Sequence, residues 1–79
     1  MVQAQQVVRI GRIDPVRRLT PRDIRVLELL AQGLSTADIA RDLGYSGSTV
    51  KNVIHALVHQ MGARNRAHAV AIAIRAGAI

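Results

Sequence analysis

Side chains that can hydrogen-bond to nucleic acid bases are concentrated in one segment of the chain, residues 48–59. Lys51 can donate to the O6 and N7 atoms of guanine, and Asn52 can pair with adenine through two hydrogen bonds. His55 follows one helical turn later, where its ring could reach a base or a phosphate. The segment contains no acidic residue, although an ordinary solvent-facing helix would carry acidic residues as well as basic ones. These residue types favour a surface that approaches a polyanion.

Metal or catalytic chemistry is the first alternative for the histidines. His55 and His59 are four residues apart, a spacing that also occurs in pairs of metal ligands, and His68 could be imagined as a third ligand. No glutamate lies between them and no acid on that face would orient either ring, so histidines near a DNA interface are the favoured interpretation. A Ser–His–acid arrangement, a glycine-rich phosphate loop and paired carboxylates are all absent. We therefore expect no enzyme, no catalytic residue, no metal and no cofactor.

A helix over residues 46–61 must position these side chains. Ser46 is a good N-cap, and Gly62 supplies a stop. At 100° per residue, one side is apolar and the other is polar. The apolar side comprises Val50, Val53, Ile54, Leu57, Val58 and Met61, and the polar side comprises Ser48, Lys51, Asn52, His55 and His59. A shorter helix is predicted between Ser35 and Gly44, so the turn of Gly44, Tyr45 and Ser46 completes a helix-turn-helix pattern. This pattern presents its second helix to the DNA major groove.

Two further helices and a basic extension complete the predicted organisation. Thr20, Pro21 and Asp23 give a cap, a first-turn proline and an acid at the third position, and Gly33 ends that helix. Asn65 caps a last helix from Arg66 to about Ala76. The expected fold class is all-α, a four-helix bundle-like helix-turn-helix domain over residues 19–79. Residues 1–18 form a basic N-terminal extension, either a mobile leader or an arm that touches DNA phosphates or a partner subunit.

Composition agrees with a nucleic acid partner and excludes several other classes. The 79 residues carry a formal charge of +6, from 11 Lys and Arg against 5 Asp and Glu. Tyr45 is the only aromatic residue, which nearly excludes base stacking on aromatic platforms. The absence of cysteine excludes disulfides, thiolate zinc sites and iron–sulfur clusters. No segment has the ~18 apolar residues of a membrane helix, and the N-terminus has no signal-peptide core. We expect a cytoplasmic protein without membrane contact.

The predicted last helix is apolar on two sides. One face carries Ala67, Val70, Ala71 and Ile74, and the other carries Ala69, Ile72, Ala73 and Ala76. Two apolar faces predict two contacts, one with the domain core and one with a second copy of the chain. The sequence does not say which face is inward; the first set is our candidate homodimer interface. A twofold dimer predicts an inverted-repeat target with half-sites about 10 base pairs apart.

The order and spacing of these pieces resemble the LuxR-type (GerE-like) helix-turn-helix domain. The resemblance runs from Leu19 to Ile79 through LTPRD, VLELLAQGLS, DIARDLG, the STVK of residues 48–51, and GARNRAHAV. It implies a bacterial, nucleoid-associated transcription regulator that binds double-stranded DNA as a dimer. The positions that match the family's base contacts are Lys51, Asn52 and His55, and those near the phosphate backbone are Thr36, Ser48, Thr49 and His59.

Departures from the family pattern bear on affinity and target sequence. Val53 stands where histidine is common, and His59 with Gln60 replaces a pair that is often basic. Arg64 and Arg66 are expected to compensate as backbone contacts. Eighteen preceding residues are too few for a receiver or ligand-binding domain, so the chain as given resembles the stand-alone form of the family. A segment cut from a longer regulator would look the same.

The remaining alternative is a protein-interaction module. Such a domain would pair with another regulator through its last helix, or contact RNA polymerase. A basic amphipathic membrane binder fits poorly, because the basic residues are spread over several elements. Salt-dependent, sequence-selective binding to DNA separates the DNA reader from the interaction module.

Overall fold

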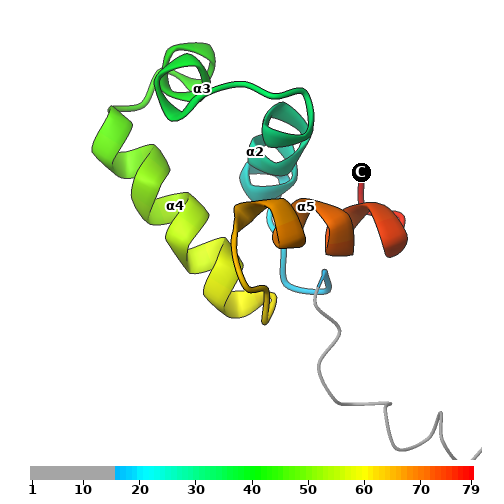
Figure 1. Ribbon diagram of the computed structural model, residues 1–79. Helices are drawn as coiled ribbons and strands as arrows, with labels where there is room; N and C mark the ends of the chain where they lie inside the picture. Colours follow the sequence, from blue (N-terminus) through cyan, green and yellow to red (C-terminus); the bar gives the residue numbers. More distant parts are fainter. Residues whose placement is uncertain (1–15) are drawn as a thin grey trace, which may run out of the picture.

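The computed structural model describes residues 16–79, which form four α-helices and no strand (Figure 1). The helices are α2 (Pro21–Ala31), α3 (Thr36–Leu43), α4 (Gly47–Gln60) and α5 (Arg66–Arg75). Within the described residues, the predicted all-α fold class is confirmed. Most of the predicted N-terminal extension, residues 1–15, lies outside the described residues. Residues 16–18 form a turn, and the side chains of Val16 and Leu19 pack against the core.

Local capping determines where each helix begins. The Thr20 hydroxyl accepts from the backbone N of Asp23 at 3.1 Å, and the Asp23 carboxylate accepts from the backbone N of Thr20 at 3.0 Å. These two bonds form the capping box that the sequence predicts for α2. Side-chain oxygens also cap the other three described helices, from Ser35, Ser46 and Asn65. Each such cap stabilises its helix by about 1 kcal/mol.

A glycine ends α3 and makes the tight turn into α4. Gly44 has φ +73°, a left-handed conformation that glycine adopts without strain. The backbone N of Tyr45 then donates to the carbonyl of Ala40 at 2.9 Å, which satisfies a carbonyl at the end of α3. Because Ser46 caps α4 immediately afterwards, α3 and α4 are joined by Gly44, Tyr45 and Ser46 alone. This is the short connection expected of a helix-turn-helix unit.

The core lies where the four described helices meet. The largest fully buried side chains are those of Val26, Leu27, Ile39 and Val50. The other buried apolar residues are Leu29, Ala40, Val53, Ile54, Leu57, Met61, Ala69 and Ala73. Helix α4 therefore buries the apolar stripe that its 100° periodicity predicts, apart from Val58, which is half-buried. This anchorage fixes α4 in the domain and leaves its opposite face to solvent.

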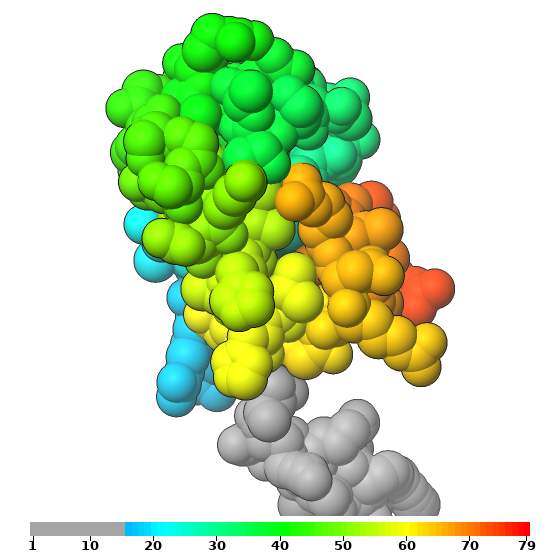
Figure 2. Space-filling model, turned by 60° about the vertical axis from the view of Figure 1, so that its left-hand side comes forward, coloured from blue at the N-terminus to red at the C-terminus, as the bar shows by residue number. Residues whose placement is uncertain are grey.

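The arrangement of the described helices leaves α4 accessible along its length. Helix α3 packs against the first part of α4, while α5 packs against both α2 and α4 (Figure 1). The first turn of α5 lies beside α4, and its last turn points away from it. None of the described helices is long and apolar enough to cross a membrane. Because the first turn of α5 lies beside α4, one face of the domain combines the outer side of α4 with the start of α5 (Figure 2).

Candidate nucleic-acid interface

The solvent-facing side of α4 has the composition that the sequence predicts. Its exposed residues with polar side chains are Ser48, Thr49, Lys51, Asn52, His55, His59 and Gln60, and Gly47 and Ala56 are also exposed. None of them is acidic, and their side chains offer amine, amide, imidazole and hydroxyl groups for hydrogen bonding. Val53 is only 7% exposed and belongs to the core. This side of α4 is a polar, acid-free ridge on a rigidly packed helix.

Acidic residues are segregated from this face along the chain. In the described residues all four acids lie in α2 and α3, and each takes part in an ion pair. Arg22 pairs with Asp23, Arg41 pairs with Asp38, and Arg25 reaches both Glu28 at 3.4 Å and Asp42 at 3.6 Å. Residues 43–79 contain no acidic side chain, and no ion pair joins Lys51, Arg64, Arg66 or Arg75 to a described side chain. The positive charge of α4 and α5 is not neutralised from within the described domain.

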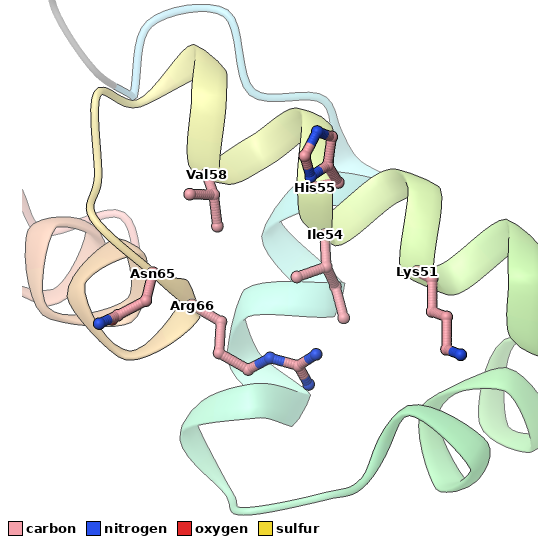
Figure 3. Close-up of a pocket in the computed structure, with 6 residues that line it drawn as sticks. All are labelled: Lys51, Ile54, His55, Val58, Asn65 and Arg66. Carbon is pink, nitrogen blue, oxygen red and sulfur yellow. The ribbon is translucent and has the colours of Figure 1, made fainter.

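A shallow hollow between α4 and α5 brings two of these cations together. It is lined by Lys51, Ile54, His55, Val58, Asn65 and Arg66 (Figure 3). The side chains of Lys51 and Arg66 extend from the two helices toward the same opening, above a floor formed by Ile54 and Val58. Its volume of about 290 Å³ lies at the lower limit of the ~300–1,000 Å³ of small-molecule pockets. The hollow can seat a small anionic group better than a drug-sized substrate.

Arg66 is also linked to the start of α3. Its Nη1 atom donates to the Thr36 hydroxyl at 3.4 Å, across 30 positions of sequence. Thr36 is the first residue of α3, and Arg66 is the first residue of α5. Thr36 and Arg66, which are both predicted to contact the DNA phosphate backbone, therefore lie together at one side of α4. This contact could not be predicted from the sequence, because only the tertiary packing of α5 creates it.

Hydroxyl groups cluster at the start of α4. The Ser46 hydroxyl accepts from the backbone N of Thr49 at 3.1 Å and donates to the Thr49 hydroxyl at 2.8 Å. The Ser48 and Ser46 hydroxyls are 3.3 Å apart. Ser48 and Thr49, both predicted backbone contacts, are thus held on the exposed first turn of the helix that carries the other polar groups.

His68 has a structural partner that sequence reasoning missed. Its Nδ1 atom accepts from the backbone N of Arg64 at 3.0 Å, while its own backbone N donates to the Asn65 side chain at 2.9 Å. A glutamate or glutamine at this third helical position commonly accepts from the backbone N of the N-cap residue, and His68 accepts instead from Arg64, the residue before the N-cap Asn65. A polar side chain at this capping position is the feature of the sequence from which the bond to His68 could have been predicted. In residues 16–79 no three His, Cys, Asp or Glu side chains lie together as a metal site.

The structure distinguishes the two apolar faces of α5. Ala69 and Ala73 are 1% and 0% exposed and face the core. On the other side Ala67 is exposed and Ile74 is 55% exposed, whereas Val70 and Ala71 are half-buried. The four predicted interface residues thus lie on the outward side of α5, although Val70 also packs against the core. Ile74 and Tyr45 are the large hydrophobic side chains that the described part of the chain leaves exposed.

The predicted contact residues are accessible, but they do not form a single cluster. Lys51, Asn52, His55 and His59 lie along α4, and Arg64 precedes α5 in the connecting loop. Thr36 is half-buried and the other predicted DNA contacts are exposed. Figure 2 shows the start of α5 beside the outer side of α4, with α3 at one end. This surface is extended, and its side chains are either polar and uncharged or positively charged. Such a surface fits a long polyanion better than a compact substrate.

Comparisons with known proteins agree with this geometry. Residues 17–73 match the family described as bacterial regulatory proteins of the luxR family. The chain is 40% identical over 60 residues to the transcriptional regulatory protein YdfI of Bacillus subtilis, covering 76% of this chain and 28% of that protein. It is 44% identical over 59 residues to the response regulator RamR of Streptomyces coelicolor, covering 75% and 29%.

A third relative extends the similarity toward the N-terminus. The HTH-type transcriptional activator RamA of Corynebacterium glutamicum is 32% identical over 74 residues, which cover 94% of this chain and 26% of that protein. The matched segment spans less than a third of each of these three relatives. The predicted LuxR-type family is confirmed. The regulators named here also agree with the prediction that the domain is not an enzyme. The chain therefore belongs to the luxR family of bacterial regulatory proteins, as a helix-turn-helix domain of DNA-binding transcription regulators.

Proposed function

We propose that this chain binds double-stranded DNA sequence-specifically as a homodimer and so regulates transcription, in the cytoplasm, on the bacterial chromosome. Helix α4 enters the major groove of each half of an inverted repeat. The observation that supports this most is the acid-free, exposed side of α4, continued by cations that have no ion-pair partner in the described domain. A surface of that kind gains binding energy from phosphates while presenting hydrogen-bonding groups to base edges.

Base reading is assigned to the middle of α4. Lys51 suits guanine, Asn52 suits adenine, and His55 lies one turn further along the same exposed side. The surrounding residues are assigned to the phosphate backbone, because their groups lie at the edges of the ridge. These residues are Thr36, Ser48, Thr49, His59, Arg64 and Arg66.

Dimerisation is assigned to the outward side of α5. Ala67, Val70, Ala71 and Ile74 provide small and branched apolar side chains, which let two helices approach closely about a twofold axis. Since α5 also packs against α4, a dimer built on α5 holds two copies of α4 at a fixed separation. Half-sites about one turn of DNA apart, roughly 10 base pairs, follow from this arrangement.

The experiment that tests this function is a binding selection from sheared bacterial DNA, followed by a salt series on the best fragment. We expect a shared inverted repeat and an affinity that falls steeply as salt rises. Binding without a shared site would instead indicate a sequence-independent coating protein.

The outward apolar side of α5 also favours a second function, docking on another regulator or on RNA polymerase. In that case α5 would pair with a different chain, and DNA binding would be weak or absent. A purified protein that binds no DNA fragment in the selection would favour this alternative over the DNA reader.

A further inference from the structure

We propose that the hollow between α4 and α5 is a seat for one phosphate of the DNA backbone, anchored by Arg66 and the Thr36 hydroxyl. This inference rests on the proposed DNA binding and deepens it, because it brings two of the proposed DNA-backbone contacts, Thr36 and Arg66, to one phosphate at a defined place between the helices. Lys51 from α4 and Arg66 from α5 line the hollow, and Thr36 from α3 is joined to it through its hydrogen bond with Arg66.

The first argument is the charge state of the hollow. Its lining includes Lys51 and Arg66 and no acid, and neither cation has an ion-pair partner among the described residues. In contrast, Arg22, Arg25 and Arg41 of α2 and α3 are each paired with a carboxylate. The domain therefore has carboxylates close to the arginines of α2 and α3 but none beside Arg66. The two cations of the hollow can therefore pair with an anion that comes from another molecule.

The second argument is the way in which Arg66 is held. Thr36 gives it one neutral acceptor at 3.4 Å, which orients the guanidinium without neutralising it. A guanidinium has five N–H donors, so most of them remain available to phosphate oxygens, in the fork geometry that phosphate prefers. The Thr36 hydroxyl accepts from Arg66 through its oxygen and can donate its own hydrogen to the same phosphate. Arg66 is thus oriented before DNA arrives, which reduces the entropy that binding must overcome.

The third argument is the size and position of the hollow. About 290 Å³ above the apolar floor of Ile54 and Val58 leaves room for a phosphate group, and the opening lies beside the exposed side of α4 (Figure 3). A phosphate held there would lie next to Lys51, which adds positive potential while its flexible stem reaches toward a base edge. This contact would fix the register of α4 in the groove, since phosphate contacts position a reading helix.

The test compares wild type with Arg66→Ala on the selected inverted repeat, as affinity against salt concentration. Each phosphate contact contributes about 0.9 to the slope of log K against log salt, so a dimer that loses two contacts should lose about 1.8. We expect affinity at low salt to fall by a factor of roughly 10 or more, equally on specific and mutated sites, because a charge-assisted hydrogen bond is lost. Thr36→Val, nearly isosteric, should weaken binding less and leave the slope close to that of wild type.

Arg75→Ala is the matched control. It removes the same charge from the same helix, but Arg75 lies in the last turn of α5, which points away from α4 (Figure 1). We expect its slope to stay close to that of wild type. Thermal melting of every variant checks folding; Arg66 is exposed, so its truncation should leave the core intact. Should Arg66→Ala melt early, Arg66→Lys keeps the charge and should keep the slope while it binds more weakly.

Two outcomes separate this inference from the function on which it rests. If wild type binds no DNA, the proposed function fails. If wild type binds with a steep salt dependence and Arg66→Ala has the same slope and affinity, the phosphate seat alone is wrong. Titration with inorganic phosphate, followed by NMR at the Arg66 side chain, identifies the source of the anion. Saturable binding of free phosphate, together with an unchanged DNA slope in Arg66→Ala, would identify a small-anion site and overturn the proposal.

Discussion

Truncation of Ile74 should weaken the dimer without disturbing the fold of the monomer. Ile74 is 55% exposed on the outward side of α5, so a large part of its side chain remains to be buried by a partner. Ile74→Ala removes three carbons at about 0.8 kcal/mol each, of which roughly 55% is available to the interface, or about 1.3 kcal/mol per protomer. A twofold interface contains this residue twice, which gives about 2.6 kcal/mol and a roughly 80-fold weaker dimer.

Sedimentation equilibrium over a range of protein concentrations measures this change directly. Tyr45→Ala is the control, since Tyr45 is the other large exposed hydrophobic of the described residues and lies in the turn between α3 and α4. We expect Tyr45→Ala to leave the dimer constant unchanged. On DNA, Ile74→Ala should weaken binding to an inverted repeat but not to an isolated half-site. A wild-type chain that stays monomeric at high concentration, or an Ile74→Ala variant that dimerises like wild type, would refute the assignment of α5.

Three other predictions concern side chains of α4 and α5. Lys51→Ala should cost about 1–3 kcal/mol at the selected site and relax preference at one base pair; an equal loss on every sequence would make Lys51 a phosphate contact instead. His68→Ala should lower the free energy of unfolding by about 0.5–1 kcal/mol in urea titrations, because the backbone N of Arg64 loses its acceptor; an unchanged midpoint would show that this bond is not formed in solution. A double His55→Ala, His59→Ala variant should bind the selected site more weakly than wild type, because two hydrogen-bonding side chains of the exposed side of α4 are lost; an unchanged affinity would contradict a role of these side chains at the DNA.

The helices could be predicted from the sequence because their signals are local. Thr20, Ser35, Ser46 and Asn65 each cap a helix by accepting from a backbone N three residues later. A bond of that range depends on residue type and backbone conformation alone, so the sequence already contains what decides it. The apolar stripe of α4 was likewise predictable, since period and residue type determine which side can be buried.

The inward side of α5 could not be predicted by the same reasoning. Both sides of that helix are apolar, so periodicity does not distinguish them. Packing against α2 and α4 decides, and it places the small side chains of Ala69 and Ala73 at the contact. Small residues let helix axes approach closely, whereas the branched Ile74 on that side would hold α5 away from the core. This is information about the shape of two other helices, which the local sequence of α5 does not carry.

Arg66 was expected near DNA only as one more basic residue, and its partner could not be foreseen. The bond to Thr36 joins positions 30 residues apart and exists only because α5 packs beside α4. His68 differs, because its partner Arg64 is four residues away and a capping pattern was there to be noticed. What separates the two cases is the range of the interaction: short-range bonds repeat known motifs, and long-range bonds require the fold.

The distribution of charge gives this small domain an orientation before any contact forms. Helices α2 and α3 carry three arginines against four acids, a net charge of −1, whereas residues 43–79 carry four cations and no acid. A uniformly basic domain would be attracted to DNA in every orientation, but here α2 and α3 contribute almost no attraction. The field therefore favours approach with α4 and the start of α5 toward the phosphates, so more encounters begin near the reading position. Because such steering is screened beyond about 10 Å at 0.1 M salt, it accelerates association in dilute salt and adds little specificity of its own. Discrimination between DNA sites must then come from hydrogen bonds between the exposed side chains of α4 and the base edges. These side chains are available for such bonds, because the acids of α2 and α3 form ion pairs with the arginines of α2 and α3.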